Sequence, residues 1–158
     1  MRPEGAASWR FVVAEDVEPA PDCLDALQAA RALVPEAVLI AAKVVLPDGS
    51  LDPASEPIPR ILDKEEAIAA ARHRLLAIRA ARPGAMLVRG EVEEPDLGST
   101  AAMLADGRGY LAPLAVATRR APAPRERLAD RIRLLRAPHW SREERLMQLF
   151  TLVAGGRR

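Results

Sequence analysis

The sequence predicts an α/β protein. Short apolar runs rich in β-branched residues alternate along the chain with longer segments whose apolar residues recur every three or four positions. Turn and helix-capping residues separate the two kinds of segment, which is typical of strands and helices that share one sheet. The length of 158 residues fits one such domain, or one domain with a helical appendage.

The first third of the chain predicts two strands with a helix between them. Residues 9–13 (WRFVV) form a β-type run that ends in an acidic cluster. Asp22 stands where it can cap a helix over 23–33, and Asp25 lies near the positive end of that helix. Residues 37–46 are apolar and rich in β-branched side chains, which predicts a buried strand.

The middle of the chain predicts a loop, a long helix and a further strand. The proline-rich stretch 51–61 is expected to be irregular. Asp63 and Glu66 form a capping-box pattern that opens a helix across 64–82, whose apolar residues fall on one stripe. A Pro-Gly pair ends this helix, and residues 85–88 are predicted to form the next strand.

A short helix and a strand complete the predicted core. The helix runs from about residue 99 to 105, and an Asp-Gly pair closes it. The strand covers 110–118 and contains Pro113. Because proline cannot donate a hydrogen bond to a neighbouring strand, we expect an edge position or a bulge there.

Two arginine-rich helices are predicted at the end of the chain. The first covers about 124–136, and the second opens with a capping box at Ser141 and Glu144. Charge divides near the same place: residues 1–118 hold 12 basic and 18 acidic side chains, whereas 119–158 hold 11 arginines and 4 acidic side chains. We therefore predict an acidic α/β core at 1–118 and a basic amphipathic helical extension at 119–158.

Composition excludes several classes of protein. The single cysteine, Cys23, leaves no internal disulfide or cysteine-based zinc site, and two histidines leave little for a histidine metal cluster. No apolar run approaches the roughly 20 residues of a membrane span, and the N-terminus has no secretory signal pattern. With 3% aromatic residues and no reading-helix motif, nucleic acid is not an expected partner. These features predict a cytoplasmic protein.

The acidic cluster after the first predicted strand is the main candidate site. Glu15, Asp16 and Glu18 follow this strand, and open α/β sheets bind ligands at the carboxyl ends of their strands. Paired carboxylates can hold a divalent cation through hard oxygen ligands, and the cation can then neutralise a diphosphate. The alternative interpretation is a solvated acidic turn.

Five segments, in the same order along the chain, resemble the inverting family-2 glycosyltransferases of the GT-A fold. The first resembles the strand, Asp-rich motif and helix of that family, and the last resembles the arginine-rich helical extension of its rhamnosyl- and galactofuranosyl-type members. The segments are 9–27 (WRFVVAEDVEPAPDCLDAL), 37–52 (AVLIAAKVVLPDGSLD), 85–91 (AMLVRGE), 109–118 (GYLAPLAVAT) and 127–146 (RLADRIRLLRAPHWSREERL).

The resemblance implies a chemistry and a set of residues. It implies a nucleotide-sugar donor with Mn²⁺ or Mg²⁺ on the Asp-rich motif, which here places Glu15 and Asp16 as metal and cofactor ligands. It places Arg89 as a further cofactor-binding residue, and Asp96 with Glu94 as the nearest candidates for the catalytic base. The implied acceptor is a cell-envelope polysaccharide or a polyprenyl-linked saccharide.

The chain also departs from the family pattern. Ala14 stands where the first aspartate of the motif is expected, and the region near Arg119 lacks the usual histidine. The family's N-terminal nucleotide-binding half has no counterpart here, so we expect a partial GT-A-type sheet with a C-terminal helical pair. An exposed sheet edge would then invite a homodimer or a partner chain. The alternative function is a non-catalytic GT-A-like interaction or scaffold module.

The basic extension has two interpretations. Arginines that flank an apolar stripe are typical of a helix lying on an anionic membrane, which suits a peripheral protein at the inner face of the plasma membrane. The alternative is an amphipathic helix packed on the acidic core.

Overall fold

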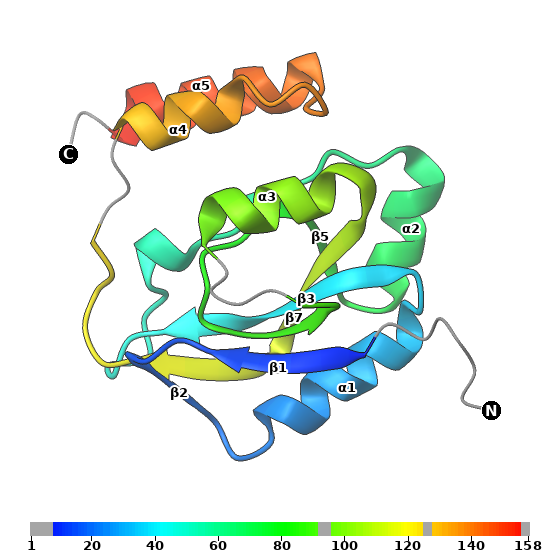
Figure 1. The fold of residues 1–158 in the computed structure, drawn as a ribbon, viewed down its shortest axis with the longest axis vertical. Coiled ribbons are helices and arrows are strands. Elements are labelled where there is room, and N and C mark those ends of the chain that lie inside the picture. The colour runs from blue at the N-terminus through cyan, green and yellow to red at the C-terminus, as the bar shows by residue number, and fades with distance from the viewer. Residues whose placement is uncertain (1–7, 92–95, 125–127, 156–158) are drawn as a thin grey trace. The chain divides into compact units, whose positions relative to one another are not determined.

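The computed structural model describes residues 8–91, 96–124 and 128–155. The chain divides into two compact units, Met1–Pro124 and Arg125–Arg158. Figure 1 shows the elements of both units.

The first unit is built on a mixed sheet of seven strands, which confirms the predicted α/β class. The strand order is β1-β6-β3-β7-β5-β4, and β2 pairs with β7 outside this path. Strands β3 and β7 are parallel, whereas the other pairs are antiparallel. The strands are β1 (Trp9–Val13), β2 (Val17–Pro19), β3 (Ala37–Val45), β4 (Ile58–Pro59), β5 (Leu76–Ala80), β6 (Ala85–Arg89) and β7 (Arg108–Arg119).

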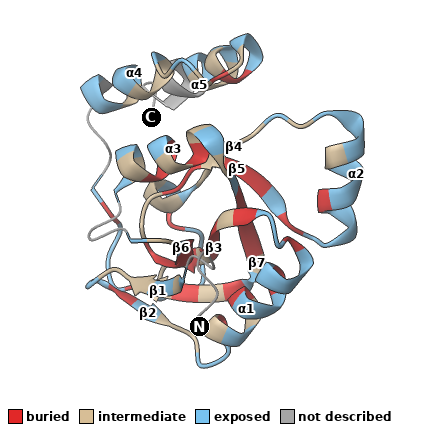
Figure 2. Ribbon diagram, turned by 45° about the vertical axis from the view of Figure 1, so that its right-hand side comes forward, coloured by how far each residue is buried: buried red, intermediate tan, exposed pale blue. Residues whose placement is uncertain are grey.

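Helices cover both faces of this sheet (Figure 1). Helix α1 (Cys23–Leu33) packs on one face, where Leu27 joins Ile40 and Ala42 of β3 in a buried cluster. Helix α3 (Leu97–Asp106) packs on the other face, where Leu104 joins the intervening residues of β3, Leu39 and Ala41. Alternate side chains of β3 therefore point to opposite faces of the sheet and contribute to both buried clusters. Figure 2 shows this strand buried between the layers.

The strands predicted at 9–13, 37–46 and 85–88 and the helix at 23–33 are confirmed. The predicted cap of that helix is wrong, because the Asp22 side chain makes no cap hydrogen bond. The stretch 51–61 is irregular apart from a 3₁₀ turn (η1, Pro53–Ser55) and the two-residue strand β4. The short helix begins at Leu97 rather than near residue 99, because the N-cap is Asp96.

The prediction of one long helix over 64–82 is wrong. Helix α2 (Lys64–Arg72) stops after nine residues, and Leu76–Ala80 forms β5 instead. The helix ends in a Schellman pattern, in which the Arg74 and Leu75 N–H groups donate to the carbonyls of Ala71 and Ala70. Arg74 takes a positive φ of 55°, a conformation for which glycine is the usual residue. The chain thus turns in time for β5 to pair with β7.

Pro113 lies in the interior of the sheet at a bulge, which is the second of the two predicted alternatives. Strand β7 runs beside β3 over its length, and the register shifts where Ala42 and Lys43 face Ala112 and Val116. On its other side β7 pairs with β5 over 109–111 and with β2 over 117–119. The proline occupies the gap between these ladders, where no donor is required of it.

The second unit is a pair of helices, α4 (Leu128–Leu135) and α5 (Arg142–Gly155). The capping box predicted at its second helix is confirmed: the Ser141 N–H donates to Glu144 Oε2 at 2.9 Å, and the Glu144 N–H donates to Ser141 Oγ at 3.1 Å. The predicted start of the first helix near residue 124 reaches into 125–127, which lie outside the described residues. Among the described helices, none has the length and apolar character needed to cross a membrane.

Candidate functional site

The acidic turn of the first unit lies between β1 and β2. Ala14 donates its N–H to the Gly84 carbonyl at 2.8 Å, which fixes the end of β1 beside the start of β6. Glu15 and Asp16 follow in an exposed turn. Strand β2 then pairs with the end of β7, with Val17 opposite Arg119, and the Arg120 N–H donates to the Asp16 carbonyl. The turn is therefore held against the last residues of β7.

A buried guanidinium organises this region. Arg119, with 5% of its side chain exposed, donates through Nη1 to Asp16 Oδ2 and through Nη2 to the Pro83 carbonyl at 2.8 Å. Its Nε lies 3.1 Å from Oδ2 of Asp52, whose side chain is fully buried. Asp16 is 49% exposed, so it presents carboxylate surface to solvent while one of its oxygens is held. We call the side chains of Asp16, Asp52 and Arg119 the ion-pair network.

Asp52 is fixed by its own loop as well as by Arg119. Its Oδ1 accepts from the Ala54 N–H at 3.2 Å and its Oδ2 accepts from Ser55 Oγ at 2.5 Å. These bonds cap the 3₁₀ turn that begins at Pro53. Because a buried carboxylate is costly unless it is paired and hydrogen-bonded, the network has a structural role whatever else it does.

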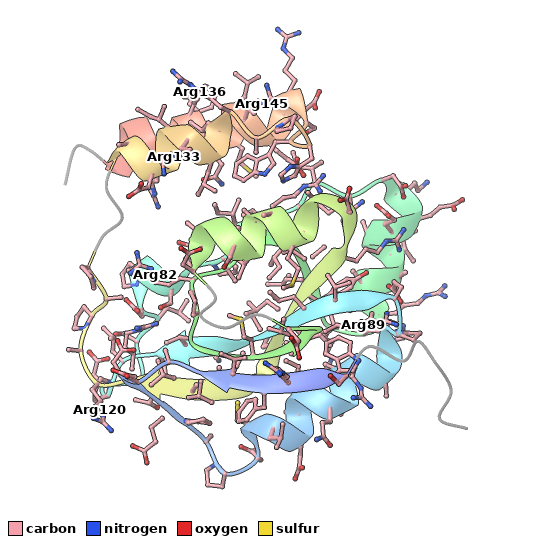
Figure 3. The ribbon with its side chains drawn as sticks, in the orientation of Figure 1. Arg82, Arg89, Arg120, Arg133, Arg136 and Arg145 are labelled. Carbon is pink, nitrogen blue, oxygen red and sulfur yellow. The ribbon has the colours of Figure 1, made fainter. Side chains whose placement is uncertain are left out.

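Two further arginines are neighbours, along the chain, of groups that contact or form the ion-pair network. Arg82 precedes Pro83, whose carbonyl accepts from Arg119, and Arg120 follows Arg119 directly. Figure 3 shows Arg82 and Arg120 on the side of the sheet where β1 and β7 end. The segment 81–84 also reaches α3, because buried Thr100 bonds to both the N–H and the carbonyl of Ala81, at 3.2 and 2.8 Å.

Arg89 does not join this region. It ends β6 and pairs with Trp9, the first residue of β1, whereas Asp16 follows the last residue of that strand. The length of β1 separates the two ends by about 13 Å of extended chain. Figure 3 shows Arg89 on the opposite side from Arg82 and Arg120. The structure therefore does not bring together the cofactor-binding set of Glu15, Asp16 and Arg89 that the resemblance implies.

Asp96, a candidate catalytic base, is the N-cap of α3. Its Oδ1 accepts from the Ser99 N–H at 2.6 Å, and Ser99 Oγ accepts from the Asp96 N–H at 2.7 Å. This reciprocal pair is a capping box, which satisfies two backbone donors at the helix start. Glu94, the other candidate base, lies outside the described residues.

The cap makes a specific prediction for stability. Asp96→Ala is expected to lower the free energy of unfolding by about 1 kcal/mol, whereas Asp96→Asn is expected to cost only a few tenths, because asparagine caps as well as aspartate. Urea unfolding of the two variants measures this difference. An equal loss in both variants would show that the carboxylate charge, and not the cap, is what matters at this position.

The residues present fit a divalent cation poorly. Among residues 8–91, 96–124 and 128–155, no group of three histidine, cysteine or carboxylate side chains is arranged to hold a metal ion. The Asp16 carboxylate, the expected main ligand, is already ion-paired with Arg119. A guanidinium thus pairs with this carboxylate where a cation was expected.

Cys23 is excluded as a nucleophile by its position. The side chain, at the first residue of α1, is fully buried in the core, and burial raises the pKa of its thiol, with a smaller contribution from the nearby Asp22 carboxylate. A raised pKa keeps the sulfur protonated and unreactive at neutral pH.

Sequence reasoning missed the central members of the ion-pair network. Asp52 stood in one of the matched segments without an assigned role, and Arg119 was noted only as replacing a histidine. One local signal was present for Asp52: an aspartate followed by proline and, at the third position, serine is typical of a side chain that caps a turn. No local signal distinguishes a buried arginine from a solvated one.

Comparison with known proteins gives no further assignment. No protein-family model, no curated protein and no solved structure matches the chain. The family resemblance stays a prediction that rests on the five segments.

Proposed function

We propose that the chain is a glycosyltransferase-like protein that binds a nucleotide-sugar donor at the acidic turn and passes the sugar to a polysaccharide or polyprenyl-linked acceptor. The observation that carries the proposal is the exposed carboxylate of Asp16, positioned by Arg119 after the carboxyl end of β1, on the side of the sheet where Figure 3 places Arg82 and Arg120. Strand ends of α/β sheets are where such ligands bind.

Each side chain has a chemical part in this proposal. Guanidinium groups bind diphosphate through charge-assisted hydrogen bonds, so Arg82 and Arg120 would hold the donor's diphosphate without a resident cation. The exposed oxygen of Asp16 would accept a hydrogen bond from a sugar or ribose hydroxyl. In inverting transfer an acceptor oxygen attacks the anomeric carbon, the bond from that carbon to the diphosphate breaks, and a base takes the acceptor proton. Asp96 remains the proposed base.

Calorimetric titration with UDP, GDP and dTDP, each with and without Mn²⁺, tests donor binding directly. We expect binding of at least one nucleotide that is largely independent of Mn²⁺ and about tenfold weaker in Arg120→Ala, which loses one charge-assisted contact. Arg89→Ala is the matched control, because it removes an exposed arginine of β6 that lies beside the first residue of β1, away from the acidic turn. Binding that strictly requires Mn²⁺, or an equal loss in both variants, contradicts the proposed site.

A non-catalytic interaction module is the second candidate function. The observation that favours it is that the carboxylates of Asp16 and Asp96 are both engaged inside the protein, one by Arg119 and the other by the N–H of Ser99. A carboxylate in such use is less available for catalysis. The absence of binding for all three nucleotides, in a chain shown to be folded, would favour this second function over the first.

A further inference from the structure

We propose that the helical pair α4–α5 is a docking surface for an anionic lipid bilayer. The proposal concerns the second unit alone and does not depend on nucleotide binding by the first. It begins with charge: residues 125–158 contain nine arginines and four acidic side chains, a net charge of +5. A surface of this charge is attracted to anionic phospholipid headgroups.

The described acidic side chains offset part of this charge at the surface. Glu143 and Asp130 are exposed, and Asp130 lies 4.0 Å from Arg133 on the same helix, whereas Glu144 is buried in the capping box with Ser141. Arg145 is turned inward and donates to the Ala137 carbonyl at 3.0 Å. Arg133 has 85% of its side chain exposed, and Arg136 and Arg142 are exposed as well. Figure 3 labels Arg133, Arg136 and Arg145 on the pair.

Large apolar side chains are exposed on the same helices. On α5, Leu146, Leu149 and Phe150 are 46%, 47% and 74% exposed, and on α4 Ile132 is 40% exposed. Positions 142, 146, 149 and 150 are separated by four, three and one residues, so Arg142 begins the same helical face that carries the three apolar side chains. A helix lying in a membrane interface has this combination of a cationic border and bulky apolar groups.

The net positive charge of the helical pair favours an anionic bilayer as its partner over a second copy of the chain. Two copies meeting at this face would bring together two units of net charge +5, which repel each other. An anionic bilayer supplies opposite charge across its whole surface and an apolar layer a few ångströms below, and arginine side chains can extend from the apolar layer to the headgroups. Both features of the face are therefore matched by one partner.

Sedimentation of the full chain with lipid vesicles tests the charge. We expect the chain to pellet with vesicles of phosphatidylglycerol and phosphatidylcholine at least tenfold more strongly than with phosphatidylcholine alone, and the difference to shrink as salt is raised. The double variant Arg133→Glu and Arg136→Glu is expected to lose this preference. Arg72→Glu with Arg89→Glu reverses the same charge at exposed positions of the first unit and should bind like the wild type.

A second pair of variants tests the apolar face. Phe150→Ser is expected to weaken pelleting with the anionic vesicles about tenfold. Leu114→Ser is the matched control, since Leu114 of β7 in the first unit has the same exposure of 74%. Circular dichroism of each variant establishes that its helices are intact.

Three results would overturn the proposal. One is a wild type that pellets with neither kind of vesicle. The others are equal pelleting with both kinds of vesicle, and loss of binding in the control variants to the same degree as in the test variants.

Discussion

Replacing Arg119 with methionine is expected to lower the free energy of unfolding of the first unit by about 3 kcal/mol, because it leaves a buried carboxylate without its counter-ion. The Asp52 side chain is fully buried and 3.1 Å from Arg119 Nε, while its other hydrogen bonds within the described residues come from the neutral groups of Ala54 and Ser55. Methionine fills a similar volume and supplies no positive charge. With an m-value of about 2 kcal/mol/M, the midpoint of urea unfolding falls by about 1.5 M.

The neighbouring arginine provides the control for this prediction. Arg120 is exposed where Arg119 is buried, so Arg120→Met is expected to change stability by less than about 0.5 kcal/mol. A Trp140→Phe background leaves Trp9, which packs against the core of the first unit, as the single tryptophan and fluorescent reporter.

A double-mutant cycle identifies which carboxylate depends on Arg119. Asp52→Asn in the Arg119→Met protein should recover part of the loss, because it removes the unpaired buried charge, whereas Asp16→Asn should recover little, because Asp16 is half exposed. If Arg119→Met and Arg120→Met lowered the free energy of unfolding equally, the buried ion pair would contribute no more to stability than an exposed arginine does.

Local sequence signals predicted the elements that depend on neighbouring residues. The strand at Trp9–Val13, helix α1 and the capping box at Ser141 and Glu144 each follow from residue types within a few positions of one another. The end of α2 did not, because its Schellman cap uses Arg74 where glycine is the expected residue. The spacing of apolar residues after Arg72 is also compatible with a helix. These residues form strand β5 instead, because they pair with β7.

The candidate site depends on contacts that lie far apart in the sequence. Asp16 and Arg119 are 103 residues apart, and the pairing of β2 with β7 is what brings them together. The sequence correctly predicted that Asp16 follows the end of a strand. It contained no local signal that the guanidinium of Arg119 would form an ion pair with the Asp16 carboxylate. Arg89 was assigned to the same site as Asp16 because of its motif after a predicted strand. In the structure, β6 pairs antiparallel with β1, so Arg89 lies beside Trp9, at the end of β1 away from Asp16.

Leu27→Ala is expected to destabilise the first unit by about 2–5 kcal/mol, an effect comparable to or larger than that of Arg119→Met. Leu27 lies on the buried face of α1, is fully buried, and belongs to the cluster that joins this helix to β3 and β7. Shortening it leaves a cavity between the helix and a sheet built largely of small side chains, and neighbours such as Ala42 and Ala112 have no atoms with which to fill it.

The same helix supplies the control, because its last residue is also a leucine. Leu33 is 47% exposed, so Leu33→Ala makes the same chemical change in the same helix and should cost less than about 1 kcal/mol. Helix propensity changes in the same direction in both variants, so the difference between them measures burial. The urea midpoint from Trp9 fluorescence reports both values. Equal losses would contradict the packing of α1 on the sheet.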